Sequence, residues 1–210
     1  VLDGEKSLEE IIVEGPFGVK LVPGASGIQH MASLNEQQTA SIISAFSELE
    51  SDIDYLIVDM AAGLSDSVMT FLCACQRRYI VLKNEPSSIA DAYATIKVML
   101  QDYNLDNIWL IPNAVTSQPD GIRLSKNINT VVKNFLGGQV NYLHSITADE
   151  MVLRATKSSK CLLDFAPSSN ATRDFKELAK IIDSQGPDIG ISGGLQFFLE
   201  RIVADQVKVG

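Results

Sequence analysis

The strongest fold signal in the sequence is an apolar run that ends in an aspartate, Tyr55-Leu56-Ile57-Val58-Asp59-Met60-Ala61-Ala62-Gly63. Residues 55–58 are apolar at every position, which is typical of a strand buried on both faces in a parallel sheet. In open parallel sheets, ligands bind at the carboxyl ends of the strands. Asp59 stands at such an end, so this stretch predicts a buried strand and a functional edge.

On both sides of this run, apolar segments of strand length alternate with segments of helical periodicity. Such alternation predicts an α/β fold with a doubly wound, mostly parallel sheet. In the helix at 124–135 we expect Ile128, Val131, Val132 and Phe135 to point inward. The predicted strands are 55–58, 79–82, 108–111 and 140–143, after a short β-rich run at 19–22, and the predicted helices are 7–13 (with a capping box at Ser7), 36–49, 65–75, 88–100, 124–135, 150–156 and 172–182 (capped by Thr172).

The bulk composition fits one cytosolic α/β domain. The chain has 210 residues and a formal net charge of −9, enough for one substantial domain and short for two. Because so acidic a chain is not attracted to phosphate backbones, we expect no direct binding of nucleic acid. The odd cysteine count, with Cys73, Cys75 and Cys161, favours a reducing compartment. No apolar run reaches the roughly 18 residues that a membrane-spanning helix needs.

Asp59 and the small residues behind it have the chemistry of a magnesium and phosphate site. A carboxylate at a strand end can hold Mg²⁺ through water, because this ion keeps most of its hydration shell. Ala61, Ala62 and Gly63 let backbone amides approach a phosphate closely. The alternative is that Asp59 only caps the next turn, and the residues alone leave both interpretations open.

Several segments carry motifs that are more specific than this pattern. They are residues 12–19 and 22–27, residues 54–68, the stretch Asn84-Glu85-Pro86-Ser87-Ser88-Ile89-Ala90-Asp91-Ala92-Tyr93, and the tail 195–201. Together they resemble the flagellar-number regulators of the FlhG/FleN type, in the MinD/ParA family of P-loop ATPases. Residues 54–68 are similar to the Walker-B and switch-II region of that family. The resemblance covers nearly the whole chain and implies a SIMIBI-type P-loop NTPase fold.

The resemblance also implies a role for individual residues in a site for ATP and Mg²⁺. Asp59 matches the Walker-B aspartate that orders the magnesium shell, and Gly63 matches the switch-II glycine that senses the γ-phosphate. Asn113 matches the asparagine that reads the adenine edge. The loop Ile146-Thr147-Ala148-Asp149 matches the second base-contacting loop, where the family usually has proline in place of Thr147.

These assignments predict one crevice and one dimer face. We expect Asp59, Gly63, Asn113 and Asp149 to converge on a single crevice at the carboxyl ends of the strands. Glu85 and Asp91 fall where MinD-like dimers face each other across the nucleotide, and this too is implied by the resemblance. Without the resemblance, we would interpret Asn113 as a turn residue after a strand and Asp91 as a solvated helix position.

The sequence departs from the family at its beginning. A P-loop needs a strand, a glycine-rich loop, and a lysine followed by Ser or Thr at a helix start. The segment Gly4-Glu5-Lys6-Ser7 lacks that spacing. By the family pattern Val1 falls just after switch I, so we expect an N-terminally incomplete sequence, short of about one βαβ unit. Phosphoryl transfer depends on the positioning and charge neutralisation that this unit supplies, so we expect the chain as printed to be inactive in ATP hydrolysis.

The tail predicts an amphipathic helix beyond a linker. A Gly, Ser and Pro-containing segment at 184–193 separates an ATPase domain at 1–183 from a membrane-targeting helix at 194–210. On a helix over 194–207, apolar residues form one stripe and its flank, which favours insertion at a membrane surface. The alternative is that the stripe packs on the domain. The predicted membrane residues are Leu195, Phe197, Phe198, Leu199 and Ile202.

Two functional hypotheses follow. The first is a cytoplasmic ATPase that dimerises around ATP, docks on the cytoplasmic face of the inner membrane and controls flagellar number and placement. The resemblance implies an SRP-type flagellar GTPase and a flagellar transcription activator as its partners. The second is a non-catalytic regulator that keeps the partner surface and has lost the nucleotide site. The coding sequence upstream of Val1 discriminates between them, because a P-loop there favours the ATPase.

Overall fold

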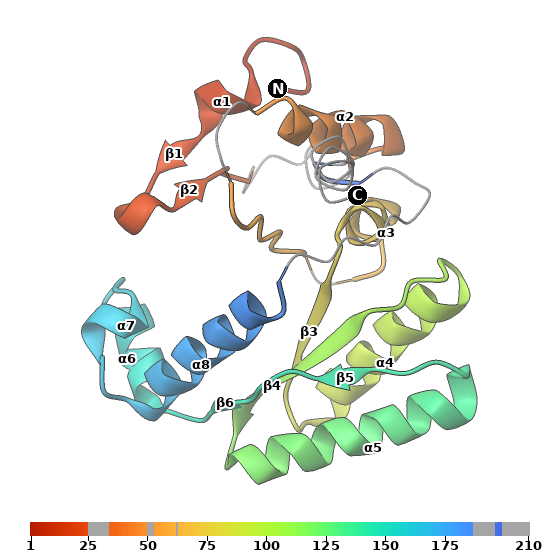
Figure 1. Cartoon of the computed structure of the whole chain (residues 1–210), viewed down its shortest axis with the longest axis vertical. Helices are drawn as coiled ribbons and strands as arrows, with labels where there is room; N and C mark the ends of the chain where they lie inside the picture. The colour runs from red at the N-terminus through yellow and green to blue at the C-terminus, as the bar shows by residue number, and fades with distance from the viewer. Residues whose placement is uncertain (25–33, 50–52, 62, 187–195, 199–210) are drawn as a thin grey trace. The chain divides into compact units, whose positions relative to one another are not determined.

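The computed structural model describes residues 1–24, 34–49, 53–61, 63–186 and 196–198 (Figure 1). The chain divides into two compact units. The first unit contains Val1–Gln76 and the tail, and the second unit contains Arg77–Asp188. The predicted boundaries of the ATPase domain, the linker and the tail helix stay predictions, because most of the linker and tail lies outside the described residues.

The second unit is built on a sheet in which β4 (Ile108–Val115) is the central strand. β3 (Arg78–Leu82) pairs with the first five residues of β4. β5 (Asn141–Tyr142) pairs with β4 near its beginning, and β6 (Ile146–Thr147) pairs with it near its end. All three pairings are parallel, which confirms the predicted sheet and three of its predicted strands.

Helices cover both faces of this sheet. Alternate residues of a strand point to opposite faces. Ile111 of β4 packs in an apolar cluster with residues of α8 (Asn170–Ser184), whereas its neighbour Leu110 is fully buried on the opposite side. On that side α5 (Gln118–Leu136) contacts β4 and α4 (Pro86–Gln101) contacts α5 (Figure 1). The doubly wound arrangement is therefore confirmed.

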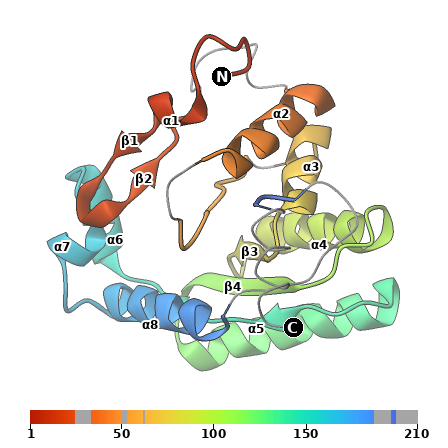
Figure 2. The same cartoon turned by 45° about the horizontal axis from the view of Figure 1, so that its top comes forward.

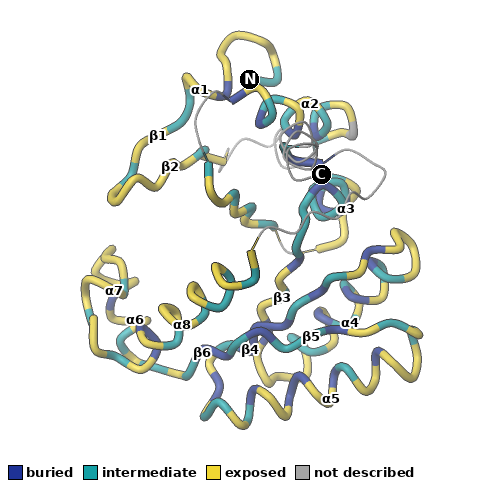
Figure 3. Tube along the Cα trace, in the orientation of Figure 1, coloured by how far each residue is buried: buried dark blue, intermediate teal, exposed yellow. Residues whose placement is uncertain are grey.

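The inward face of α5 differs in part from the prediction. Ile128 and Val132 are buried as expected, but Val131 is 41% exposed and Phe135 is 72% exposed. The helix begins at Gln118, six residues before the predicted start, and its buried face follows a four-residue spacing. Buried and exposed residues alternate along α5 (Figure 3), because each residue rotates by about 100° around the helix axis and only one side of the helix faces the sheet.

The cap of α8 also differs from the prediction. The hydroxyl of Ser169 accepts a hydrogen bond from the backbone N–H of Thr172, so Ser169 is the N-cap and Thr172 is already inside the helix. Thr172 is fully buried, and its own hydroxyl donates to the carbonyl of Ala166 at 2.8 Å. Two shorter helices precede α8, namely α6 (Glu150–Lys157) and α7 (Leu162–Phe165).

The first unit combines a small hairpin with a helix pair. The predicted capping box at Ser7 is present, because Ser7 and Glu10 exchange hydrogen bonds at the start of the first helix. The helices α2 (Glu36–Ser47) and α3 (Asp66–Ala74) lie side by side in both views (Figures 1 and 2). The elements are α1 (Leu8–Ile11), β1 (Val13–Glu14), the 3-10 turn η1 (Pro16–Gly18), β2 (Lys20–Leu21) antiparallel to β1, α2 (Glu36–Ser47) and α3 (Asp66–Ala74).

The prediction of a buried strand at 55–58 is wrong for this structure, in which the segment belongs to no strand. Ile57 is 89% exposed and Tyr55 is 56% exposed. Leu56 and Val58 instead pack against the core of the first unit. A strand buried on both faces needs hydrogen-bonded neighbours, and among the described residues of this unit only β1 and β2 form a ladder. The segment therefore buries one side alone.

The described part of the tail, 196–198, packs into the core of the first unit. Phe197 is 2% exposed, with ring centroids 5.3 Å from Phe46 and 6.2 Å from Phe71. Phe197 and Phe198 lie in a turn, and Phe198 has a φ of 57°, so the predicted helix does not run through these residues. Leu195, Leu199 and Ile202 lie outside the described residues. Within the part of the chain that the structure describes, no helix is long and apolar enough to cross a membrane.

A close backbone approach joins α5 to the sheet at Gly121. A Cβ atom at this position would lie 1.9 Å from the hydroxyl oxygen of Ser145, 2.8 Å from its Cβ and 3.3 Å from the Cβ of Pro112. The two distances to Ser145 are shorter than real Cβ contacts allow, and the distance to Pro112 is tight. Rotation of the Ser145 hydroxyl relieves only the first of them, so the position has room for glycine alone.

We predict that Gly121→Ala lowers the free energy of unfolding by about 3 kcal/mol, because overpacking forces the helix away from the sheet. An alanine in an uncrowded helix would instead stabilise it. Urea denaturation of both proteins measures the difference.

The matched control is Ser125→Ala, one turn farther along α5. The Ser125 hydroxyl is buried without a hydrogen-bond partner in the described structure. Its removal is expected to leave stability unchanged or to raise it, because an unsatisfied buried hydroxyl destabilises the folded state. Equal stability of Gly121→Ala and wild type would contradict the proposed close packing.

Candidate functional site

The carboxyl ends of β4 and β6 bring together the predicted base-contacting residues of the second unit. Asn113 is the register partner of Ile146, and Val115 is the partner of Thr147. The register shifts between these pairs, at Ala114, whose φ is 54°. Asn113 and the loop 146–149 therefore lie next to each other at one edge of the sheet, as the sequence predicts.

The side chain of Asn113 is held by its own strand, β4. Its Oδ1 accepts a hydrogen bond from the N–H of Ala114 at 2.9 Å, and the residue is half-buried. An asparagine amide has two N–H donors and an acceptor with two lone pairs. One lone pair of Oδ1 is used by Ala114. The amide therefore keeps two N–H donors, which can donate to the acceptor atoms of a purine edge, and one further acceptor position. The role of Asn113 as a base reader stays a prediction.

Asp149 ties two helices to the loop. One carboxylate oxygen accepts from the N–H of Met151 at 2.9 Å, which caps α6, and the other accepts from the N–H of Ala171 at 3.2 Å, in the first turn of α8. These two backbone hydrogen bonds, Met151 first, lower the pKa of Asp149. Sequence reasoning made Asp149 a base contact and missed this capping role, although an aspartate followed by Glu150 at a helix start is a capping signal.

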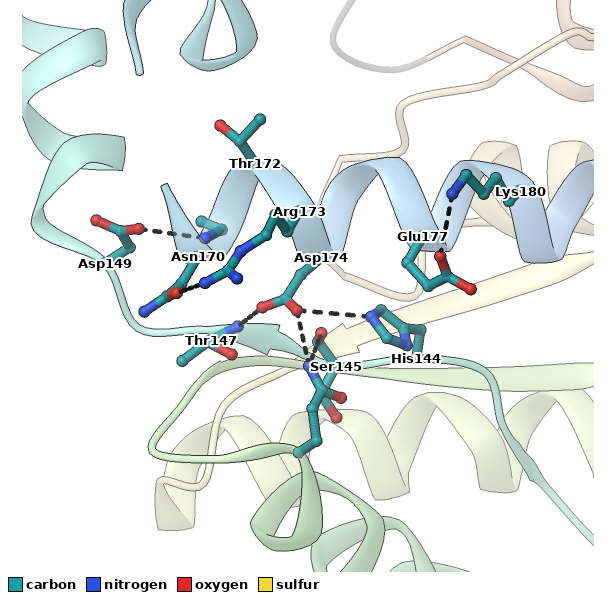
Figure 4. Close-up of polar contacts among 12 residues, drawn as sticks. His144, Ser145, Thr147, Asp149, Asn170, Thr172, Arg173, Asp174, Glu177 and Lys180 are labelled. Carbon is teal, nitrogen blue, oxygen red and sulfur yellow. Dashed lines mark hydrogen bonds and ion pairs between the residues drawn. The ribbon is translucent and has the colours of Figure 1, made fainter. Parts of the chain in front are cut away.

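Thr147 stands where the resemblance implied proline. Its backbone N–H donates to Asp174 of α8 at 2.8 Å (Figure 4). Proline has no N–H, so this contact is possible because the residue is threonine. Asp174 was not a predicted site residue. Nothing in its sequence neighbourhood points to the loop, which is 27 residues earlier in the chain.

The predicted magnesium and switch residues, Asp59 and Gly63, belong to the first unit. Asp59 is exposed and directly follows the extended segment 55–58. Gly63 is exposed too, with a φ of 119° that strongly favours glycine. The structure describes the two units separately, so convergence of Asp59 and Asn113 on one crevice stays a prediction.

The two predicted dimer-face residues both lie on α4. Glu85 is the N-cap residue of that helix, followed by Pro86 in its first turn, and Asp91 lies within it. Both side chains are exposed. The geometry permits contact with a partner, and the dimer role stays a prediction.

The donor set fits a hydrated magnesium ion better than a tightly caged metal. No group of three His, Cys, Asp or Glu side chains that could hold a metal occurs among the described residues. Mg²⁺ commonly keeps several waters and binds through one or two carboxylates together with nucleotide phosphates. A single exposed carboxylate such as Asp59 is compatible with that mode.

Sequence comparison identifies relatives of the whole chain. No family model matches it. The chain is 36% identical to the antiactivator FleN of Pseudomonas aeruginosa over 203 residues, which cover 97% of this chain and 72% of that protein. It is 30% identical to the flagellum site-determining protein YlxH of Helicobacter pylori over 206 residues, which cover 96% of this chain and 69% of that protein.

Solved structures show the same fold. The septum site-determining protein MinD of Pyrococcus horikoshii, complexed with Mg-ADP, superposes with a TM-score of 0.68 at 21% identity, over 88% of this chain and 72% of that one. The MinC:MinD complex of Aquifex aeolicus gives a TM-score of 0.65 at 17% identity, over 91% of this chain and 74% of that one. These likenesses define a MinD-like α/β protein.

The chain thus has the fold of the MinD/ParA class of P-loop ATPases. Within this class, the chain is 36% identical to FleN over 97% of its length. It belongs to the FlhG/FleN family of flagellar-number regulators.

We predict that the free energy of unfolding of Asp149→Ala falls less than that of wild type as the pH is lowered into the acidic range. Because the folded pKa of Asp149 lies below its unfolded value, its carboxylate stabilises the fold at every pH above the unfolded value of about 4. That stabilisation disappears as the pH falls through the folded pKa. Urea denaturation between pH 7 and pH 3 should show wild type more stable at pH 7, with the difference shrinking below about pH 4.

Glu150→Ala is the control for this prediction. Glu150 is the next residue and forms an exposed ion pair with Arg154 at 3.5 Å, a type that contributes little to stability. Its removal is expected to change the pH profile much less. A constant difference between wild type and Asp149→Ala across the whole range would contradict the assignment.

Proposed function

We propose that this protein is a regulator of flagellar number that is switched by an adenine nucleotide with Mg²⁺. In the ATP-bound state it dimerises and docks on the cytoplasmic face of the membrane. The observation that carries the proposal is the register of Asn113 with Ile146, which puts an amide and a loop side by side at the carboxyl edge of the sheet. Ligands bind at that edge in open α/β folds.

The chemistry of this edge suits a purine base. The N–H donors and remaining lone pair of the Asn113 amide complement the N7 acceptor and N6 amino group of adenine. Ile146, next to it in register, is 3% exposed and belongs to an apolar cluster. The loop 146–149 is fixed by Asp149 and by the contact of Thr147 with Asp174. A base would therefore meet a preformed edge.

The proposed phosphate side depends on the first unit. Asp59 would hold Mg²⁺ through water, and the backbone N–H at Gly63 would face the terminal phosphate. The solved MinD with Mg-ADP supports this choice of cofactor for a chain of the same fold. Bound Mg²⁺ would neutralise phosphate charge, and the chain's part is to position the base and the ion.

The proposed partners follow from the relatives. FleN is an antiactivator by name, which supports a transcription activator as one partner, and we add an SRP-type flagellar GTPase as a second. The solved MinC:MinD complex shows that a protein of this fold binds another protein. The exposed position of Glu85 and Asp91 on α4 is compatible with their place in a nucleotide-dependent dimer.

We predict that Asn113→Ala in the full-length gene product weakens ATP binding by about tenfold, because it removes hydrogen bonds worth roughly 1.4 kcal/mol. Isothermal titration calorimetry with ATP and Mg²⁺ measures the dissociation constants. Asn134→Ala, which removes an exposed asparagine of α5, is the matched control and should bind like wild type. Absence of ATP binding by the wild-type full-length protein would replace this proposal with the non-catalytic regulator.

A test of the proposed membrane role of the tail needs substitutions that leave the core of the first unit intact. Phe197 packs between Phe46 and Phe71, so a charge at Phe197 would also destabilise the first unit. Leu199→Glu with Ile202→Glu changes two positions of the predicted apolar stripe and lowers the net charge by two. Arg201→Glu lowers the net charge equally on the predicted polar face.

We predict that the Leu199→Glu/Ile202→Glu protein loses most of its ATP-dependent pelleting with phosphatidylethanolamine–phosphatidylglycerol vesicles, whereas Arg201→Glu keeps it. Burial of each apolar side chain contributes about 1.5–3 kcal/mol when complete, and a dimer combines two tails. Co-sedimentation with ATP and with ADP provides the measurement. Equal pelleting of the two variants in ATP would assign the tail to packing or to partner binding.

A further inference from the structure

Asp174 of α8 is the centre of a polar network beneath the base-contacting loop (Figure 4). Its Oδ2 accepts from the backbone N–H of Thr147 at 2.8 Å, and its Oδ1 accepts from the Gln118 side chain at 3.0 Å. Its side chain is 16% exposed. The Nε2 atom of His144 lies 3.8 Å from Oδ1, so the carboxylate faces three polar groups of the second unit, from Thr147, Gln118 and His144.

A second layer of hydrogen bonds orients the Gln118 amide. Its Nε2 also donates to the carbonyl of Ser145 at 2.9 Å, and its Oε1 accepts from the hydroxyl of Tyr142 at 3.1 Å. The Tyr142 hydroxyl in turn accepts from the Ser145 hydroxyl at 3.1 Å. Each partner fixes the next, because a satisfied buried network selects one arrangement of its members.

The hydrogen bond from Thr147 to Asp174 lies on the side of β6 where a further strand could otherwise pair. In a parallel ladder the N–H groups along a strand point alternately to its two neighbours. The N–H of Ala148 donates to Val115 of β4 at 2.8 Å, so the N–H of Thr147 points away from β4. In the described structure β6 pairs with β4 alone, and the Asp174 carboxylate occupies the position of the missing carbonyl acceptor.

We propose that Asp174 is a positioning residue for nucleotide binding: it fixes the backbone of the loop 146–149 in the conformation that accepts the base. This inference rests on the proposed function, because it assigns a support to the same base edge. The folding of α8 itself does not require the contact, since Ser169 caps that helix and its apolar face packs on Ile111 and Ile146. The carboxylate instead holds the backbone of the loop in a single conformation.

The test compares ATP with inorganic tripolyphosphate, which has the phosphates and lacks the base. The full-length gene product is titrated with each in the presence of Mg²⁺, as wild type, Asp174→Asn and Glu177→Gln. In Asp174→Asn an NH₂ group faces either Thr147 or Gln118, both of which are donors, so one contact is lost. Glu177→Gln removes a carboxylate one turn along the same helix, from an exposed pair with Lys180.

The expected result is an ATP dissociation constant raised by about tenfold in Asp174→Asn, as one lost charged hydrogen bond predicts. Tripolyphosphate binding should change by less than about twofold, and Glu177→Gln should match wild type with both ligands. Equal weakening of ATP and tripolyphosphate binding would show that Asp174 supports the fold in general and does not position the base-binding loop. Unchanged ATP binding would remove it from the site. Wild type that binds ATP no tighter than tripolyphosphate would refute the proposed base edge itself.

A measurement on the wild type keeps the inference testable if Asp174→Asn does not fold. Hydrogen exchange of the nucleotide-free protein reports on the N–H of Thr147, which should exchange as slowly as that of Ala148, a ladder donor. Exchange at the rate of an open loop would show that Asp174 does not hold the loop before the nucleotide arrives, and would overturn the proposal.

Discussion

The pairing of three strands with β4 is the constraint on which the second unit depends. β3 and β5 occupy the beginning of β4, and β6 occupies its end, all in parallel register. Because parallel strands require crossovers, these pairings fix where α4 and α5 run. They also determine the site, since the register shift at Ala114 falls where β6 begins to pair. The position of Asn113 beside Ile146 is thus a consequence of sheet register, and Gly121 lets α5 approach Ser145 closely at the same end of the sheet.

Much of this arrangement could be predicted from sequence because its elements are strongly periodic. The strands at 79–82 and 108–111 and the helices around them lie where apolar patterns placed them. The segment 55–58 has the same apolar pattern and forms no strand, because a strand exists only where a neighbour completes its ladder. The capping of α8 was misplaced by three residues for a related reason: Ser169 and Thr172 both suit an N-cap, and the burial of Thr172 decides between them.

The candidate site was predictable as a set of chain positions and not as a set of contacts. Asn113 and Ile146 follow predicted strands, so their meeting at one edge follows from topology. Asp174 carries no comparable signal, because its partners Thr147 and Gln118 are distant in sequence and only the packing of α8 on the sheet brings them together. The tail is similar. An amphipathic stripe indicates burial, but only the described contacts of Phe197 show that its ring enters the aromatic cluster of the first unit.

The loop 146–149 and α8 hold each other by reciprocal carboxylates. Asp149 of the loop accepts from the backbone of Ala171 in α8, and Asp174 of α8 accepts from the backbone of Thr147 in the loop. Both ties end on backbone N–H groups, which every residue except proline provides. The tie from Asp174 ends on the backbone N–H of position 147, so it does not depend on the Thr147 side chain. This explains how threonine can stand where a ring-restricted proline is usual: the restriction that the ring would impose on the backbone is supplied here by a hydrogen bond from a neighbouring helix.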